Sequence, residues 1–315
     1  MVAQSIRSLT AQNYAGAFRI VLVDDHSTDA TADIARRADA ASRLTVIRAA
    51  PLPPGWTGKL WALSQGIEHV GAPNYLLLTD ADIVHPPDNV AGLVARAESG
   101  YDLVSYMAKL KCDSLAERAL IPAFVLFFLL LYPPAAIRNP RRKTAGAAGG
   151  CILIRREMLE RIGGIAAIRN ELIDDCALAR AVKRAGGRVW LGLSEQMRSI
   201  RSYATFGEIG RMISRTAFTQ LRYSPLLLAG TILGLALAFW LPVALTIAGQ
   251  PLGALAWLLM SIWYWPTLRF YGRSPFWAPL LPLIATFYMG CTVHSAVQYW
   301  RGAGGLWKGR TQASR

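Results

Sequence analysis

The uneven distribution of charge and hydrophobicity along the chain is the feature that most restricts its fold. All 20 acidic residues precede position 225, whereas the last 91 residues contain six basic residues and no acidic one. Of the 315 residues, 53% are hydrophobic and 17% are charged, whereas soluble domains carry about 25% charged residues. An apolar, acid-free C-terminal part beside a mixed-charge N-terminal part indicates a membrane anchor attached to a catalytic or binding domain. We therefore expect two domains, residues 1–224 and 225–315.

Strand and helix patterns alternate through the first of these domains. Apolar runs that predict buried strands cover residues 19–25, 44–49, 74–82 and 101–110, with helical spacing between them. This order predicts an α/β fold with a doubly wound, Rossmann-like parallel sheet. Such a sheet binds its ligands in the crevice at the carboxyl ends of the strands.

The second domain contains three apolar spans, roughly residues 225–249, 251–268 and 277–299. The first has the length and composition of a transmembrane helix. The second is short and ends in aromatic residues, as segments at a membrane interface do. We expect a multi-pass membrane region in which one of the spans can be re-entrant.

A further apolar stretch, residues 119–137, interrupts the first domain and is followed by the basic run 138–143. Pro122, Pro133 and Pro134 are expected to break a helix there. A crossing at this point would also place the two halves of the domain on opposite sides of the membrane. We therefore expect a membrane-interfacial insert, with the basic run against anionic headgroups. A buried core helix is the alternative.

Two acidic clusters follow predicted strands. The carboxylates of Asp24 and Asp25 can accept hydrogen bonds from a nucleobase or a ribose. Asp80 and Asp82 can share a hard cation such as Mg²⁺ or Mn²⁺, which prefers oxygen ligands and leaves positions open for phosphate. His85 is near enough to assist, although a lone histidine is more often structural.

A third acidic pair, Asp174 and Asp175, lies at the start of a predicted helix. A carboxylate there can act as a general base on a hydroxyl, or it can compensate the helix dipole. Lys59 follows a loop rich in proline and glycine, and it can reach a diphosphate or remain a solvated lysine. Arg211 and Arg215 can neutralise a leaving diphosphate or contact lipid headgroups.

Five segments in this order resemble glycosyltransferase family 2, which has the GT-A fold. They are DDHSTDAT (24–31), GKLWALSQG (58–66), DAD (80–82), GGCILIRREMLERIGG (149–164) and DDCAL (174–178). The resemblance covers about residues 1–224. Within the family, the chain looks closest to hopene-associated (hopanoid-biosynthesis) glycosyltransferases, which are similar in turn to ceramide glucosyltransferases.

The resemblance implies a membrane-bound, inverting glycosyltransferase at the cytoplasmic face of the inner membrane. Its donor would be a nucleotide-diphosphate sugar, with UDP favoured, and its acceptor a lipid, with a hopanoid as one possibility. The implied cofactor is Mg²⁺ or Mn²⁺. The implied residues are, for nucleotide-sugar binding, Asp24, Asp25, Lys59 and Asp80; for the metal, Asp80 and Asp82; for catalysis, Asp175 as base and Arg215 at the leaving diphosphate.

The sequence departs from the family pattern in two places. Family members begin with a strand of the type VSVVVPARNE, and we expect this first strand to be missing here because a helix starts at Met1. The QxxRW motif of processive synthases is reduced to Arg215 within residues 212–216, which favours a single transfer. A processive polysaccharide synthase and a degenerate, non-catalytic membrane protein remain alternatives. Nucleic-acid binding is not expected, because the basic runs adjoin apolar spans.

Overall fold

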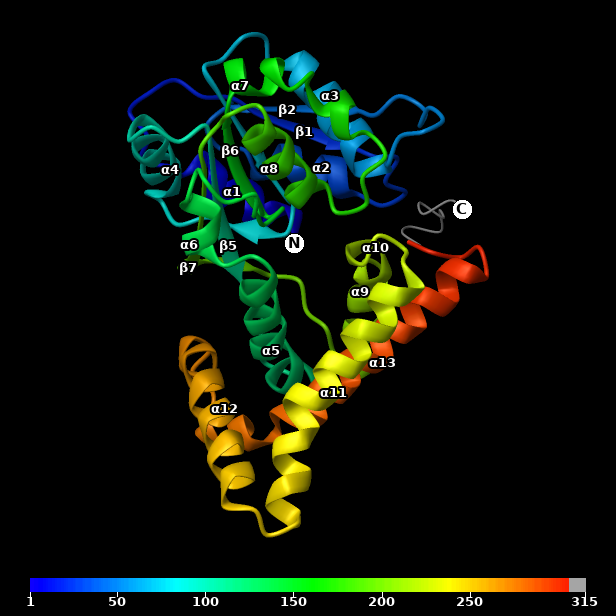
Figure 1. Ribbon diagram of the computed structural model, residues 1–315. Helices are drawn as coiled ribbons and strands as arrows, with labels where there is room; N and C mark the ends of the chain where they lie inside the picture. Colours follow the sequence, from blue (N-terminus) through cyan, green and yellow to red (C-terminus); the bar gives the residue numbers. More distant parts are fainter. Residues whose placement is uncertain (306–315) are drawn as a thin grey trace. The chain divides into compact units, whose positions relative to one another are not determined.

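The computed structural model describes residues 1–305, which form two compact units (Figure 1). The first unit contains residues 1–110 and 132–201. The second contains residues 111–131 and, of the described chain, residues 202–305. The apolar segment in the middle of the chain therefore belongs with the C-terminal helices, because it packs against them rather than against the sheets.

The strands of the first unit form two sheets. The smaller sheet pairs β1 (Ile20–Asp24) with β2 (Leu44–Arg48) in parallel, and Ile20 lies opposite Leu44. The larger sheet has the order β3-β6-β5-β7-β4. Its strands are β3 (Tyr75–Thr79), β4 (Ile83–Val84), β5 (Leu103–Lys109), β6 (Cys151–Arg155) and β7 (Val189–Ser199).

The predicted α/β class is confirmed, but the larger sheet is mixed rather than wholly parallel. β5 runs parallel to β7, whereas β6 is antiparallel to both of its neighbours, β3 and β5. β6 follows a long excursion of the chain through the second unit. It is therefore not bound by the right-handed crossover that makes successive strands of an alternating strand–helix pattern parallel. Local periodicity cannot reveal this reversal.

Helices enclose these sheets, and the central strands β5 and β6 are mostly apolar because both of their faces are covered. Leu103 and Val104 of β5 and Ile154 of β6 are completely buried. The helices of this unit are α1 (Val2–Thr10), α2 (Thr31–Ala38), α3 (Gly58–His69), α4 (Asn89–Glu98), α6 (Pro134–Arg138), α7 (Arg156–Arg161), the 3₁₀ helix η1 (Ile165–Ile168) and α8 (Asp174–Arg184).

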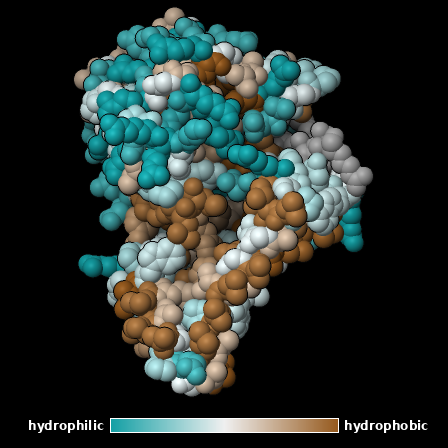
Figure 2. All heavy atoms as spheres, viewed as in Figure 1, coloured by the Kyte–Doolittle hydropathy of each residue, from teal (hydrophilic) through white to brown (hydrophobic). Residues whose placement is uncertain are grey.

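In residues 111–131 and 202–305, the regular structure of the second unit is helical. Its elements are α5 (Leu115–Leu131), α9 (Phe206–Ser214), α10 (Ala217–Gln220), α11 (Pro225–Ile247), α12 (Pro251–Phe270), the 3₁₀ helix η2 (Pro275–Leu280) and α13 (Leu281–Trp300). Apolar residues cover the visible surface of α11 and α12 (Figure 2). Leu226, Ile247 and Leu252 are each at least 75% exposed, and so extensive an apolar surface indicates contact with another apolar phase.

Three segments of the described chain are long and apolar enough to cross a membrane: Leu115–Arg138, Pro225–Ile247 and Pro275–Trp300. The predicted spans near 225–249 and 277–299 coincide with two of these segments. The expected span at 251–268 forms α12, which has 20 residues but is not apolar enough to be among these segments.

The helix expected to break at Pro122 continues through it as α5, and this part of the prediction is wrong. Proline removes one backbone hydrogen bond, and an apolar helix tolerates that loss where neighbouring helices support it. The Tyr288 hydroxyl donates to the carbonyl oxygen of Leu120 at 2.9 Å, and the Phe127 ring contacts both Phe239 and Tyr288. α5 ends ahead of Pro133, as expected. The interfacial position of this segment stays a prediction.

Candidate active site

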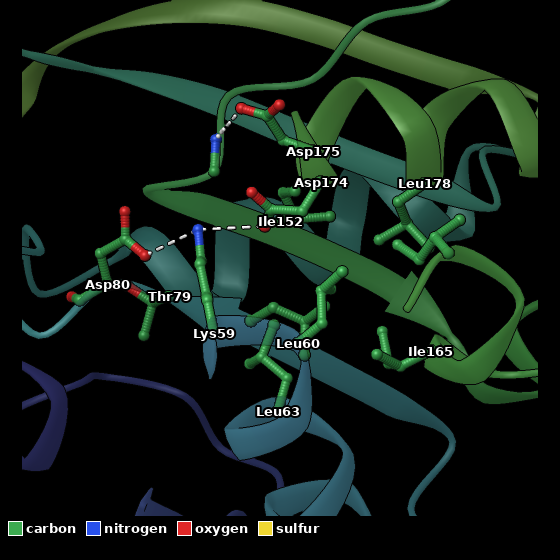
Figure 3. Close-up of a pocket in the computed structure, with 13 residues that line it drawn as sticks. Lys59, Leu60, Leu63, Thr79, Asp80, Ile152, Ile165, Asp174, Asp175 and Leu178 are labelled. Atoms are coloured by element: carbon green, nitrogen blue, oxygen red, sulfur yellow. Dashed lines mark hydrogen bonds and ion pairs between the residues drawn. The ribbon is translucent and has the colours of Figure 1, made fainter. Parts of the chain in front are cut away.

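Lys59, in the first turn of α3, lies between two carboxylates of the first unit (Figure 3). Its Nζ is 3.1 Å from Oδ1 of Asp80, which follows β3, and 3.1 Å from Oδ2 of Asp174, at the start of α8. Burial alone would lower the pKa of Lys59, but Asp174 and Asp80 raise it well above its usual range. The ammonium therefore stays charged. Lys59 thus connects Asp80, predicted for the donor side, with Asp174, which belongs to the acidic pair predicted for the acceptor side.

Asp175 is held by two backbone N–H groups. Its Oδ2 accepts from Gly149 at 2.9 Å and its Oδ1 accepts from Cys176 at 2.7 Å. Burial, followed by repulsion from Asp174, raises the pKa of Asp175 to about 6, although Lys59 and the two N–H groups act in the opposite direction. A carboxylate with a pKa close to neutral is suited to act as a general base.

Gly149 explains why the loop before β6 is rich in glycine. A Cβ at this position would lie 3.0 Å from Nζ of Lys59 and 3.3 Å from Oδ2 of Asp175. Any larger residue would therefore push against both charged groups. The double glycine at 149–150 is the sequence signal for this close approach, although the motif alone assigns Gly149 no individual role.

The Lys59 ammonium and its neighbouring carboxylates lie at one side of a pocket whose remaining lining is apolar (Figure 3). Lys59, Thr79, Asp80, Asp174 and Asp175 form its polar part together with Gly149. The apolar side chains that line it are Leu60, Leu63, Leu78, Ile152, Ile165, Ile168 and Leu178. These side chains exclude water from one side of the charged cluster, which is the physical cause of the burial effect on Lys59 and Asp175.

Asp80 and Asp82 lie two residues apart beyond the end of β3. Burial and repulsion from Asp80 raise the pKa of Asp82 above its usual range. No group of three or more His, Cys, Asp or Glu side chains in residues 1–305 could hold a metal ion by itself. A pair of carboxylates is a donor set that Mg²⁺ commonly uses when water and phosphate oxygens complete its coordination shell. The metal role of Asp80 and Asp82 stays a prediction.

Asp24 is the last residue of β1 and Asp25 follows it, so the pair lies at the end of a strand, as predicted. The Asp24 carboxylate accepts from the backbone N–H of Ser27 at 3.0 Å and so shapes the turn that follows. His26 in this turn has a φ of 55°, a left-handed conformation that few residues adopt. The Asp24 carbonyl accepts from the N–H of Ala49 at 2.9 Å, beside the end of β2. α3, which carries Lys59, also packs against β1.

His85 has a structural role. It is 3% exposed, and its two ring nitrogens lie 2.9 Å from the Thr79 hydroxyl and 2.9 Å from Nδ2 of Asn89. Because an amide nitrogen donates, Nδ1 accepts from Asn89 and Nε2 donates to Thr79. Burial lowers the pKa of His85 to about 4, so the ring is neutral near pH 7. It supports the last residue of β3, directly before Asp80.

Arg215 belongs to the second unit, where it follows α9 and its backbone N–H donates to the carbonyl of Arg211. The structure thus brings Lys59, Asp80 and Asp174 into contact, with Asp175 beside them, in the first unit. The role predicted for Arg215 stays a prediction.

This chain belongs to glycosyl transferase family 2, whose sequence model matches residues 1–163. The undecaprenyl-phosphate 4-deoxy-4-formamido-L-arabinose transferase of Shewanella sediminis is 34% identical over 113 residues, which cover 36% of this chain and 33% of the relative. The protein of the same name from Salmonella paratyphi A is 30% identical over 116 residues, covering 36% and 35%. The matched stretch thus spans about a third of each relative's length.

Two solved structures are similar to this chain at a lower level. A crystal structure of a mycobacterial protein has a TM-score of 0.42 and 19% identity, and the match covers 69% of this chain and 70% of that one. The crystal structure of TarS from S. aureus has a TM-score of 0.41 and 18% identity, over 69% and 37%. The family predicted from the motifs is confirmed, and the narrower resemblance to hopene-associated members stays a prediction.

Proposed function

We propose that this chain is a membrane-bound glycosyltransferase. It would transfer a sugar from a nucleotide-diphosphate sugar, with UDP the favoured nucleotide, to a lipid at the cytoplasmic face of the inner membrane. The observation that carries the proposal is the Lys59 cluster, in which Asp80 and Asp174 share one ammonium and Asp175 lies beside them. Membership of glycosyl transferase family 2 and the three apolar segments support it.

On the donor side, Asp24 and Asp25 would accept hydrogen bonds from the base and the ribose. Asp80 and Asp82 would hold Mg²⁺ or Mn²⁺ against the diphosphate, and the bound cation would supply Lewis-acid stabilisation of the departing charge. Their place beyond the end of β3 agrees with the position of ligands in α/β sheets.

On the acceptor side, Asp175 would remove the proton from the lipid hydroxyl. The hydroxyl oxygen would form a bond to the anomeric carbon, and the bond from that carbon to the diphosphate oxygen would break on the opposite face, which inverts the configuration. The nucleoside diphosphate leaves with the electron pair, and the proton stays on Asp175. The N–H groups of Gly149 and Cys176 hold the carboxylate in place, which keeps the base oriented during the transfer.

The nucleophile of the acceptor is a point on which the site and the relatives differ. The relatives are named as undecaprenyl-phosphate transferases, so a lipid phosphate is the second candidate. A phosphate monoester has a second pKa of about 6 and is mostly ionised at neutral pH, so it needs no general base. The partly buried carboxylate of Asp175, with its raised pKa, therefore favours a hydroxyl acceptor, for which a hopanoid is one candidate.

The basic run 138–143 supports a membrane location. Lys183 fixes the shape of this loop, because its Nζ contacts the carbonyl oxygens of Ala136, Asn139 and Thr144 at 3.3, 3.1 and 2.7 Å. The arginines and the lysine of the run are exposed. They directly follow the apolar segment Leu115–Arg138, where basic residues can bind anionic headgroups.

The decisive experiment measures release of nucleoside diphosphate by membranes that carry the chain. A panel of nucleotide sugars is tested with Mn²⁺ or EDTA, and with a lipid alcohol, undecaprenyl phosphate or no added lipid. We expect release that requires both the metal and the lipid alcohol, and that disappears in Asp175→Asn. Asp33→Asn, an exposed carboxylate on α2 paired with Arg36, is the matched control and should retain activity.

Each other outcome has a definite meaning. Release with undecaprenyl phosphate that survives Asp175→Asn would establish a phosphate acceptor and refute the base role. Polymer formation would favour a processive synthase. A folded protein that releases nothing from any donor would favour the non-catalytic alternative and contradict the proposal.

A further inference from the structure

We propose that the Lys59 ammonium competes with a divalent cation for the Asp80 carboxylate. Binding of the cation displaces the ammonium toward Asp174. This inference rests on the proposed function, because it assumes a cation at Asp80 and Asp82. It concerns what the chain's own lysine does before and after the cation arrives.

The contacts of Lys59 are those of a shared counter-ion. Its Nζ is equally far, 3.1 Å, from Asp80 and from Asp174. The two carboxylates differ in access, since the Asp80 side chain is 41% exposed and that of Asp174 is 20% exposed. A cation arriving from solution therefore reaches Asp80 more readily, and Asp174 is the partner that Lys59 can keep.

A divalent cation and the ammonium repel each other when both lie beside the Asp80 carboxylate. Mg²⁺ binds oxygen at about 2.1 Å, so a cation on Asp80 would lie within a few ångströms of the present position of Nζ. Repulsion between like charges at that distance is strong in a partly buried site. The four-carbon stem of lysine is flexible, so Nζ can move while its α-carbon remains in the first turn of α3.

The surroundings favour movement of Nζ toward Asp174. Leu60 and the other apolar residues of the pocket lie on one side of the cluster, and an ammonium would lose hydration among them. Asp174 and Asp175 lie on another side, and Gly149 carries no side chain that would block the way to them. Displacement from Asp80 therefore brings the positive charge closer to the acidic pair of the acceptor side.

The exchange would couple the two halves of the reaction. Without donor, Lys59 shares its single positive charge between Asp80 and Asp174, which partly offsets the cost of burying them. With donor and cation in place, the cation neutralises Asp80, and the ammonium is then concentrated on Asp174 and Asp175. Lys59 is thus a positioning residue that transmits occupancy of the metal site to the base.

The test measures binding of Mn²⁺ alone to the full-length, detergent-solubilised protein, with free Mn²⁺ followed by electron paramagnetic resonance. Lys59→Met should bind Mn²⁺ roughly tenfold to a hundredfold more tightly than the natural protein, the change expected when one nearby positive charge is removed. Lys59→Arg keeps the charge and should bind like the natural protein. Asp174→Asn should bind more weakly, because Lys59 then has Asp80 as its remaining carboxylate partner.

Lys183→Met is the matched control, since Lys183 contacts backbone carbonyls rather than carboxylates. It should leave Mn²⁺ affinity unchanged. Adding Asp82→Ala to Lys59→Met should abolish the gain, which shows that the tighter binding occurs at the proposed metal site. Near-ultraviolet circular dichroism verifies that every variant is folded.

Equal or weaker Mn²⁺ binding by folded Lys59→Met would overturn the competition, and so would a gain that persists without Asp82. The outcomes that refute this inference can be distinguished from those that refute the proposed function. Nucleotide release that is indifferent to EDTA would remove the metal from the reaction, whereas metal-dependent release with no effect of Lys59 on Mn²⁺ affinity would refute this inference alone.

Discussion

The replacement Asp175→Asn should stabilise the protein above pH 6 and destabilise it near pH 4. It should also abolish transfer of the sugar to a hydroxyl. Burial and the neighbouring Asp174 raise the pKa of Asp175 from the usual 3.8 to about 6. Between these two values, native Asp175 keeps a proton that the unfolded chain releases. The native state therefore binds more protons in this window, and the stability of the natural protein falls as the pH rises from about 4 to about 6.

The magnitude follows from the same difference. At about 1.4 kcal/mol for each pH unit, the ionised carboxylate lowers the free energy of unfolding by at most about 3 kcal/mol above pH 6. The asparagine avoids this cost, but its single acceptor oxygen cannot serve the N–H groups of both Gly149 and Cys176. Loss of one hydrogen bond costs about 1 kcal/mol. The variant should thus be more stable by about 1 to 2 kcal/mol above pH 6, and less stable by about 1 kcal/mol near pH 4.

The assay is thermal unfolding of the purified chain in detergent at a series of pH values, combined with nucleotide release at the same pH values. We expect the difference in Tm between variant and natural protein to change sign between pH 4 and pH 7. The natural protein's transfer rate should rise with pH through about 6, and the variant should lose roughly 100-fold or more in rate. Asp33→Asn should show neither effect.

Two outcomes would refute this reasoning. If Asp175→Asn is less stable at every pH, the carboxylate serves mainly to hold the start of α8 and the loop at Gly149. If the variant keeps its rate with a lipid alcohol, the base lies elsewhere. Loss of donor binding in the variant would instead place Asp175 in the nucleotide site.

Three further predictions concern other parts of the molecule. Asp82→Ala should abolish metal-dependent donor binding in calorimetry, and a donor affinity still sensitive to EDTA would contradict the ligand assignment. Glu117→Ala should destabilise the second unit by roughly 3 kcal/mol, because the buried Glu117 carboxylate accepts from three backbone N–H groups, including that of Tyr203 at 2.6 Å. The loss should lower the Tm, and an unchanged Tm would contradict this prediction. Replacing Arg141 and Arg142 by glutamine should weaken the preference for anionic over zwitterionic nanodiscs by about 1 kcal/mol per residue, and an unchanged preference would contradict headgroup contact.

Much of the site could be predicted because its chemistry is encoded in short segments. Asp80 and Asp82 directly follow an apolar strand, and Asp174 and Asp175 begin a helix, so local pattern located each pair at the end of an element. The distance between these pairs is not a local property. That Lys59 joins Asp80 to Asp174 depends on how α3, β3 and α8 pack, which no spacing in the sequence expresses.

The α/β class and the apolar helices followed from periodicity and composition, since alternation of strands and helices and long uncharged runs depend on neighbouring residues. Periodicity and composition did not predict three other features. These are the reversal of β6, the grouping of residues 111–131 with the C-terminal helices, and the continuity of α5 through Pro122. Each depends on contacts between residues far apart in the chain, such as Tyr288 with Leu120. Local patterns set which elements form and which groups they carry, whereas packing between distant segments sets which of those groups meet.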